Sequence, residues 1–334
     1  MGCGVETTRF TFRAFAEPTP GVRWQAFFEE SWPSYRDWFL QEGEAARPSY
    51  VTSRRKLGEH MPELVPLYDQ LVELAGGGDL AARMLAMYRP PPYLAGCSQA
   101  AWTRDAPLLV RNYDYAPSRL EGVTLCTAWS GRRIIGMSDC LWGLLDGMND
   151  DGLAVSLTFG GRRVLGDGFG IPLVVRYLLE TCSTVAEACA RLERIPFQLA
   201  HNLTLVDAAG AAVTAFVAPD RRPGYRSLPV ATNHQGDVEW IEHASFTRTI
   251  ERERRIEAML RDPAITREAF ADAFLAPPLF STAYSRGFGT LYTAVYDPTA
   301  GEISYRWPGT TWRHSFAAFD EGTRTQPLVE VAVA

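Results

Sequence analysis

The ten residues RPPPYLAGCS, at positions 89–98, divide the chain into two regions of different character. Before them, apolar residues recur every three or four positions, which is the spacing of amphipathic helices. After them, short runs of apolar and alternating residues are separated by Gly, Pro, Asn and Asp, which is typical of strands and turns. Consecutive prolines favour an extended backbone. This stretch is therefore expected to be a stiff connection that ends where the first strand begins.

The region before residue 90 is predicted to be helical. Aromatic residues between positions 27 and 39 lie at roughly helical spacing, although Pro33 is expected to interrupt the run. Residues 61–87 show the same periodicity, and Gly76-Gly77-Gly78 marks a helix end followed by a turn.

Downstream of Gly96 the pattern predicts strands, a pair of helices, further strands, a helical region and final strands. The expected strands are 98–103, 108–113, 124–129, 133–138, 142–148, 153–159, 203–207, 211–217, 227–232, 290–297, 302–307 and 313–318. The expected helices are 169–181, 184–195 and a region over about 244–275. This order is typical of an α+β fold in which helices cover layered sheets.

The composition excludes several classes of partner. The chain has 334 residues and a formal net charge of −6, which argues against general binding to nucleic acid or to anionic membranes and leaves small neutral or cationic partners open. The charged run at 248–255 (RTIERERR) alternates acids and bases, so it is interpreted as a solvated helix face. The start of the chain carries no signal-peptide pattern and no apolar run is long enough to cross a bilayer, so a cytoplasmic protein without membrane contact is expected. A homo-oligomer stays open.

The cysteines and histidines do not predict a metal or a cofactor. Six cysteines are scattered without a CxxC pair, which favours free thiols in a reducing compartment, and five histidines lack metal-ligand spacing. No cofactor is therefore expected.

Gly96-Cys97-Ser98 is the first candidate for chemistry. Glycine permits close approach to its carbonyl, so the Cys97 thiol could attack the Gly96 carbonyl, form a thioester and be released by water. The new chain would start at Cys97 with a thiol and an α-amine on one residue. That amine, with an ordinary pKa of about 7.7–8.0, could serve as the general base. The alternative is a buried structural cysteine in a strand.

Four other positions offer polar groups to such a nucleophile. Arg111 and Asp114 end the next expected strand, so a hairpin can bring the Asp114 carboxylate beside Cys97, where it could hold the α-ammonium; a strand-end ion pair is the alternative. Asn149 lies in a strand connection and is either an oxyanion donor or a turn residue, with the turn favoured. Asn233 follows an expected strand and is suited to donate to an oxyanion.

Two further residues are weighed as site components. Arg286 precedes a late strand and could bind a carboxylate or stabilise developing negative charge. His234 lies beside a turn, where a lone histidine is usually a hydrogen-bonded surface or cap residue.

Taken in order, these segments resemble the penicillin acyltransferase (isopenicillin-N acyltransferase) family and, more distantly, choloylglycine hydrolases. The resemblance covers most of residues 90–310 and is carried by Gly96-Cys97-Ser98, Arg111-Asn112-Tyr113-Asp114, residues 146–153, Thr232-Asn233-His234 and Ser285-Arg286. The family often has Thr where this chain has Ser98.

The resemblance implies a four-layer αββα N-terminal-nucleophile (Ntn) hydrolase fold with a helical N-terminal segment. It implies that Cys97 is both the autoproteolytic and the catalytic nucleophile, that Asp114 positions the α-amine, that Asn233 contributes to the oxyanion hole and that Arg286 supports the site. Residues 1–96 would remain bound as a small subunit after cleavage at Gly96/Cys97, and residues 97–334 would form the catalytic domain.

The predicted activity is cleavage or transfer of an acyl group at the amide bond of a small molecule, through a Cys97 thioester. Two alternatives are kept. One is an uncleaved thiol hydrolase with His234 or His201 as the base, and the other is a catalytically silent binding protein on the same fold.

Overall fold

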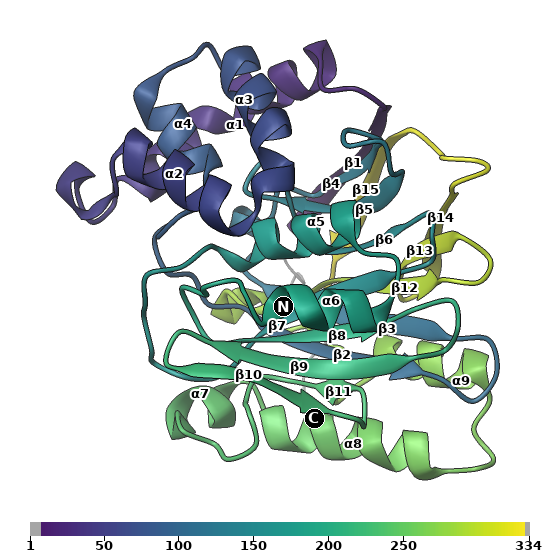
Figure 1. Cartoon of the computed structure of the whole chain (residues 1–334). Coiled ribbons are helices and arrows are strands. Elements are labelled where there is room, and N and C mark those ends of the chain that lie inside the picture. The colour runs from purple at the N-terminus through teal and green to yellow at the C-terminus, as the bar shows by residue number, and fades with distance from the viewer. Residues whose placement is uncertain (1–7, 331–334) are drawn as a thin grey trace, which may run out of the picture.

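The computed structural model describes residues 8–330. Over these residues a pair of β-sheets packs face to face, with helices on the outer face of each sheet (Figure 1). Three hydrophobic clusters match this arrangement: one lies between the sheets and one lies under each helical layer. The α+β fold with four layers, helix–sheet–sheet–helix, is thereby confirmed.

The larger sheet has nine strands, and its neighbours are antiparallel except for one pair. In spatial order the strands are β10 (Arg221–Arg226), β9 (Ala212–Ala218), β8 (His201–Val206), β7 (Ala154–Phe159), β6 (Gly143–Asn149), β5 (Ile134–Asp139), β4 (Val123–Thr127), β1 (Thr8–Glu17) and β15 (Gly322–Leu328). The parallel pair is β1 with β4. Strand β1 therefore lies inside the sheet, although it comes from the N-terminal region of the chain.

The smaller sheet has six antiparallel strands. Their order is β11 (Val230–Ala231), β2 (Gly96–Trp102), β3 (Leu108–Tyr115), β12 (Gly289–Asp297), β13 (Glu302–Trp307) and β14 (Thr310–Ser315). The segment that precedes β2, residues 91–95, is neither helix nor strand. The sequence-based division at Gly96 therefore coincides with the start of a strand in this sheet.

Helices cover the two outer faces. The larger sheet packs against α5 (Ile171–Thr181), α6 (Val185–Leu192) and an N-terminal group formed by α1 (Val22–Phe39), α2 (Tyr50–His60), α3 (Val65–Leu74) and α4 (Asp79–Leu85). The smaller sheet packs against α8 (Thr249–Arg261) and α9 (Arg267–Asp272), which follow the short helix α7 (Ile241–Phe246).

The predicted interruption at Pro33 is wrong, because α1 runs through it from Val22 to Phe39. Proline removes one backbone hydrogen bond and leaves the carbonyl four residues earlier without its donor. Both Pro33 and Glu29, which carries that carbonyl, are exposed, so water can bond the carbonyl. The aromatic residues of the opposite face, including Trp24 and Phe28, are buried and hold the helix in place.

Three strands were not expected from the sequence: β1, β10 and β15. Most side chains of β10 and β15 are exposed, and these two strands form the edges of the larger sheet. Edge strands are held by backbone pairing on one side and need no apolar face. Strand β1 does alternate polar and apolar residues (TRFTFRAFAE), so its signal was present in the sequence.

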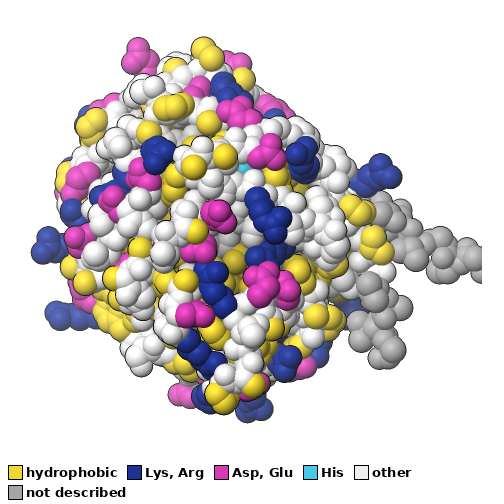
Figure 2. Space-filling model, turned by 90° about the vertical axis from the view of Figure 1, so that its right-hand side faces the viewer, with side chains coloured by type: hydrophobic (Ala, Val, Ile, Leu, Met, Phe, Trp, Pro, Cys, Tyr) yellow, Lys and Arg dark blue, Asp and Glu magenta, His cyan; other side chains and the backbone are white. Residues whose placement is uncertain are grey.

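Three further features concern the described residues as a whole. No helix within residues 8–330 is long and apolar enough to cross a membrane. The cysteines in this range are free thiols, namely Cys97, Cys126, Cys140, Cys182 and Cys189, while Cys3 lies outside the described residues. Figure 2 shows acidic and basic side chains interspersed over one face of the molecule.

Candidate active site

Cys97 is the second residue of β2 and lies between the two sheets. Strand β2 pairs with β3 on one side and with β11 on the other, and the register places Cys97 opposite Tyr113 and Gly96 opposite Asp114. The Cys97 side chain is fully buried in the cluster between the sheets. Residues that follow β11 or end β3 are therefore brought beside Cys97 by strand pairing alone.

Arg111 faces the thiol. It precedes Tyr113 by two residues on β3, so both side chains point to the same face of the sheet. The Arg111 Nη2 donates to Cys97 Sγ at 3.4 Å, and the guanidinium lies over the Tyr113 ring, 4.7 Å from its centroid. Its Nη1 donates to the Leu145 carbonyl at 2.7 Å and forms a buried ion pair with Asp146. These contacts of Nη1 thus fix the guanidinium on the side away from the thiol.

The carboxylate of Asp146 was not singled out from the sequence. It lies on β6, in the opposite sheet, and accepts hydrogen bonds from Tyr292 Oη at 2.5 Å and from Tyr296 Oη. These two tyrosines are four residues apart on β12, which places them on one face. Since the contact joins two sheets, no local spacing in the sequence indicates it.

The environment keeps the Cys97 thiol protonated at neutral pH. Burial raises the pKa of the thiol, and the neighbouring Arg111 opposes this effect only in part. A buried thiol with a raised pKa is a weak nucleophile until a base removes its proton. Any chemistry at Cys97 therefore requires a base within reach.

Asn233 contacts the backbone of Cys97. It follows β11, and its Oδ1 accepts from the Cys97 N–H at 3.1 Å. Its Nδ2 donates to the Ala95 carbonyl at 3.3 Å and to the Phe159 carbonyl at 3.1 Å. The structure therefore places Asn233 at the junction 95–97, with its amide oriented by contacts on both ends.

Arg252 completes the cluster and corrects the interpretation of residues 248–255. This run was expected to be a solvated helix face, yet the Arg252 side chain is buried. Its Nη1 donates to the Cys97 carbonyl at 2.5 Å and to Ser98 Oγ at 2.8 Å, and its Nη2 donates to Asn233 Oδ1 at 2.7 Å.

The signal for this burial was faint. The buried residues of α8 are Thr249, Arg252, Ile256 and Met259, which is helical spacing. Arg252 is the only charged residue among these four. Its burial depends on the strand against which this face of α8 packs.

Asp114 is near Cys97, but its contacts differ from the expected ones. Its Oδ1 accepts from Thr290 Oγ1 at 2.7 Å, and its Oδ2 is 3.4 Å from Arg252 Nη1. The N–H of Cys97 donates to Asn233 rather than to this carboxylate. Burial raises the pKa of Asp114, and the Arg252 guanidinium opposes the rise. Asp114 is thus linked to Cys97 through Arg252.

Two predicted site residues lie apart from this cluster. Asn149 is buried at the end of β6, where its Nδ2 donates to the carbonyls of Leu179 and Cys182 at 2.9 and 2.7 Å and its Oδ1 accepts from Leu153 N at 2.9 Å. These contacts match the turn interpretation. Arg286 is exposed at the end of a 3₁₀ turn, and within residues 8–330 no hydrogen bond or ion pair joins it to Cys97, Arg111, Asp114 or Asn233.

The histidines considered as alternative bases have other partners. His234 Nε2 is 3.1 Å from Glu253 Oε2 and its Nδ1 is 3.0 Å from Thr249 Oγ1. His201 is buried among aromatic rings, and burial lowers its pKa to about 4. Among the described residues, the hydrogen bonds of Cys97 involve no histidine.

Gly96 packs directly against the ring of Phe288. A Cβ built at this position would lie 2.0 Å from Cζ of Phe288, well inside the contact distance of two carbons. Phe288 in turn packs edge-on against Phe246. A larger residue at position 96 would therefore require the Phe288 ring to shift.

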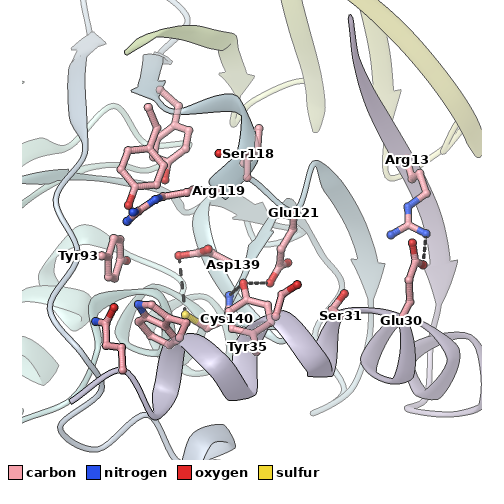
Figure 3. Close-up of a pocket in the computed structure, with 16 residues that line it drawn as sticks. Arg13, Glu30, Ser31, Tyr35, Tyr93, Ser118, Arg119, Glu121, Asp139 and Cys140 are labelled. Carbon is pink, nitrogen blue, oxygen red and sulfur yellow. Dashed lines mark hydrogen bonds and ion pairs between the residues drawn. The ribbon is translucent and has the colours of Figure 1, made fainter. Parts of the chain in front are cut away.

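A cavity of about 510 Å³ lies next to this cluster (Figure 3). We call it the α1 pocket, because α1 forms one wall; its lining includes Tyr35, Trp38, Tyr93, Tyr113, Glu121 and Asp139. Tyr113 connects the pocket to the site. It lies opposite Cys97 on the neighbouring strand, and its ring packs against the Arg111 guanidinium. Among residues 8–330, no group of three or more His, Cys, Asp or Glu side chains is arranged to hold a metal ion.

Comparison with known proteins identifies relatives of this fold. Structures with a similar fold include a mutant of the conjugated bile acid hydrolase from Clostridium perfringens (14% identity, TM-score 0.47, covering 69% of this chain and 96% of that one). Penicillin V acylase from Agrobacterium tumefaciens is another (15% identity, TM-score 0.48, 69% and 90% covered). An N-acylethanolamine-hydrolyzing acid amidase orthologue from Caenorhabditis elegans is a third (13%, 0.44, 70% and 100%).

No curated protein sequence matches the chain. A family model does: the one described as "Acyl-coenzyme A:6-aminopenicillanic acid acyl-transferase" matches residues 102–312, more than half of the chain. This range begins just after Cys97 and includes Arg111, Asp114, Asn233 and Arg252. The chain therefore belongs to the acyl-coenzyme A:6-aminopenicillanic acid acyl-transferase family.

Proposed function

We propose that this enzyme activates itself by cutting the Gly96–Cys97 bond and then cleaves or transfers the acyl group of a small-molecule amide through a Cys97 thioester. The observation that supports this most directly is the arrangement at Cys97. Its Sγ accepts from Arg111, while its backbone N–H donates to Asn233. The thiol and the nitrogen of one residue are thus held by separate polar groups.

The processing step follows from this arrangement. The Cys97 sulfur attacks the Gly96 carbonyl carbon, and the thiol proton passes to the Cys97 nitrogen as the Gly96–Cys97 C–N bond breaks. The nitrogen leaves as the α-amine while Gly96 becomes a thioester. Water then hydrolyses the thioester, which yields a Gly96 carboxylate and regenerates the thiol. The products are residues 1–96, proposed to stay bound as a subunit, and a catalytic domain of residues 97–334.

The same groups serve the acyl reaction. The α-amine of Cys97, still oriented by Asn233 Oδ1, takes the thiol proton. Arg111 stabilises the thiolate as it forms, since its guanidinium already contacts Sγ. The thiolate attacks the substrate carbonyl, and the amine of the substrate leaves with a proton from the ammonium. Water or an acceptor amine then takes the acyl group from the thioester.

Asn233 is the proposed oxyanion donor. Its Nδ2 now donates to the carbonyl of Ala95, at the long end of the hydrogen-bond range. Movement of the Ala95 carbonyl away from Asn233 after cleavage would free this N–H for the substrate carbonyl oxygen. A neutral donor that is held from behind loses little on reorganisation, which favours transition-state stabilisation. Asp114 and Arg252 are proposed to position Asn233 and the Cys97 backbone.

The alternative of an uncleaved Cys–His hydrolase is less well supported, because His234 and His201 are engaged elsewhere. A silent binding protein would need no base at all, and the electrophile test below addresses it.

Intact-mass spectrometry of the purified protein tests the proposal. The wild-type chain is expected to give two masses that meet at Gly96/Cys97, whereas Cys97→Ala is expected to give one full-length mass. Cys140→Ala is the matched control, because Cys140 is a second buried cysteine that lines the α1 pocket and should not affect processing. A single full-length wild-type mass would remove the α-amine from the mechanism. If an electrophilic analogue of an amide substrate fails to label Cys97, the alternative of a catalytically silent binding protein would be favoured.

A further inference from the structure

The α1 pocket contains two carboxyl groups without a cationic partner. Asp139 and Glu121 both line it, and within residues 8–330 neither forms an ion pair with arginine, lysine or histidine. Arg13, at the rim, is paired with Glu30 at 2.6 Å. In Figure 3 the Asp139 carboxylate points into the space beside Tyr93, and the Arg119 side chain extends away from Glu121 toward the same part of the cavity.

Both carboxyl groups are well buried for side chains that lack a counter-ion. Asp139 is only 8% exposed. Glu121 Oε1 accepts from Leu141 N at 2.7 Å and from Tyr35 Oη, and the Ser138 hydroxyl is a further neutral partner of the carboxyl, so none of these partners carries a positive charge. Buried carboxylates are normally paired, because removal from water is costly. No ion pair among the described residues balances either carboxyl group, and Arg119, which also lines the pocket, interacts with Tyr115 instead.

The backbone that presents Asp139 is strained. Cys140 and Leu141, which follow it, both have positive φ, 56° and 74°, and neither is a glycine. Their N–H groups are held by the Tyr35 hydroxyl at 2.9 Å and by Glu121. Left-handed conformations of ordinary residues are concentrated at ligand sites, where surrounding contacts enforce them. The turn is thus built to hold Asp139 against the cavity.

Aromatic rings form much of the remaining wall. Tyr35 and Trp38 come from α1, Tyr93 from the connection before β2, and Tyr113 from β3. Aromatic faces attract organic cations through their negative quadrupole, and they also pack against alkyl chains. A pocket lined by carboxylate and aromatic side chains is therefore suited to bind an ammonium group on a hydrocarbon chain.

We propose that the α1 pocket binds a positively charged amine group of the substrate, with Asp139 and Glu121 as counter-ions. The assignment of this amine to a substrate rests on the proposed function of Cys97; the binding of a cation does not. Tyr113 joins the two regions, since it lines the pocket and pairs with Cys97. The substrate class is therefore an acyl amide that carries a second, protonated amine.

The protonation of Asp139 adds a linked prediction. Burial and the charge of Glu121 raise the pKa of Asp139 to about 8, while Tyr93, the Cys140 backbone N–H and the more distant Arg111 oppose the rise. The free pocket thus holds a proton at neutral pH that a bound cation would displace. Affinity for an alkylamine, which stays protonated below about pH 10, should rise between pH 6 and pH 8.

Binding is measured first, by calorimetry on full-length Cys97→Ala protein, so that neither processing nor turnover affects the result. The probes are 2-phenylethylamine and the neutral 2-phenylethanol, which have nearly the same shape. The amine is expected to bind at least about tenfold more tightly, because a buried ionic partner is gained. Equal affinities for amine and alcohol would overturn the inference without the need for any further variant.

Variants then assign the effect. Asp139→Asn in the same background should weaken amine binding at least about tenfold, reduce its pH dependence and leave alcohol binding within about twofold. This change neutralises a poorly solvated group and keeps its shape, so folding should persist. Asp69→Asn is the control, since it removes one negative charge from an exposed ion pair with Arg54 on the surface. Unchanged amine binding in Asp139→Asn would exclude the proposed counter-ion.

Turnover by the wild-type enzyme separates this inference from the proposed function. One matched pair of amides is 6-aminohexanoyl anilide and hexanoyl anilide; the other is N-hexanoyl-1,6-diaminohexane and N-hexanoylhexylamine. Preferential cleavage of a cationic member supports both ideas and shows which side of the amide carries the amine. Amine binding without any turnover would retain the pocket and overturn the proposed activity. Turnover that favours the neutral members would overturn the pocket's role and retain the activity.

Discussion

Arg252 joins the polar groups around the Gly96–Cys97 bond. It contacts the Cys97 carbonyl, the Ser98 hydroxyl and the side chains of Asn233 and Asp114. A guanidinium suits this place because it presents several donors in a rigid plane and stays charged when buried. Its Nε donates to the Thr247 carbonyl at 2.7 Å, and its other contacts are to groups that orient the nucleophile or the oxyanion donor, so Arg252 is a positioning residue.

We expect Arg252→Gln to slow the appearance of the two fragments by about 10²–10³-fold, which is the usual effect of removing one fixed donor. A time course of intact-mass spectrometry measures this, alongside the thermal midpoint. Arg252→Lys should recover part of the rate, because lysine restores the positive charge but lacks the several fixed N–H donors of the guanidinium.

Arg255→Gln provides the matched control. Arg255 is on the same helix but exposed, so its change should leave the rate unaltered. Processing at the wild-type rate in Arg252→Gln would show that the cluster does not depend on this guanidinium.

Strand β6 shows how one element carries both chemical and structural polar residues. Asp146 is in its interior and faces the opposite sheet, where it anchors Arg111. Asn149 is at its end and ties the strand to the C-terminal end of α5. The two side chains are three residues apart, and in a strand an odd separation places them on opposite faces. Only Asp146 can therefore contribute to the cluster at Cys97.

Asn149→Ala is expected to reduce the free energy of unfolding while leaving the activity of each folded molecule within about twofold. The change removes the side-chain partners of the Leu179 carbonyl and of the Leu153 N–H, at about 1–3 kcal/mol for a buried group. The Cys182 carbonyl keeps its hydrogen bond from Arg132. Denaturant titration gives the stability, and labelling of Cys97 gives the number of active sites by which turnover is normalised. Loss of turnover at full occupancy and unchanged stability would instead make Asn149 a catalytic residue.

At the scale of the molecule, the segment before Gly96 is integral to the architecture. Strand β1 pairs with β4 and β15 inside the larger sheet, and α1 contributes buried aromatic side chains to the core and one wall of the α1 pocket. Removal of this segment would expose a sheet edge and a large apolar surface at once. The pocket also needs both segments, since Asp139 comes from β5 and Tyr35 from α1.

The two proposed fragments should therefore remain associated after cleavage. Size-exclusion chromatography under native conditions is expected to show one species of the same size as Cys97→Ala, which resolves into two chains only in denaturant. Elution of the catalytic fragment alone, with retained activity, would contradict the role assigned to residues before Gly96. It would also show that the wall of the α1 pocket formed by α1 is not needed for substrate binding.

Much of the fold follows from local patterns in the sequence. The strands from 98–103 to 153–159, the helix pair near 169–195 and the late strands all appear within a few residues of their predicted bounds, because apolar periodicity reports which side of an element is buried. Strands β10 and β15 were missed for the same reason: edge strands with exposed side chains carry no such periodicity.

For the candidate site, some residues could be predicted from the sequence and others could be found only from the tertiary structure. The order along the chain and the family resemblance predicted Cys97, Arg111, Asp114 and Asn233 as site residues, and their chemical roles stay predictions. Strand pairing brings the ends of neighbouring strands together, and the structure places these four residues around one bond. Arg252, the anchor Asp146, the exposure of Arg286 and the meeting of Asp139 with Glu121 in one pocket were decided by tertiary structure alone. Each depends on which helix or sheet packs across from the residue, and burial of a charge is set by those distant neighbours rather than by adjacent residues in the chain.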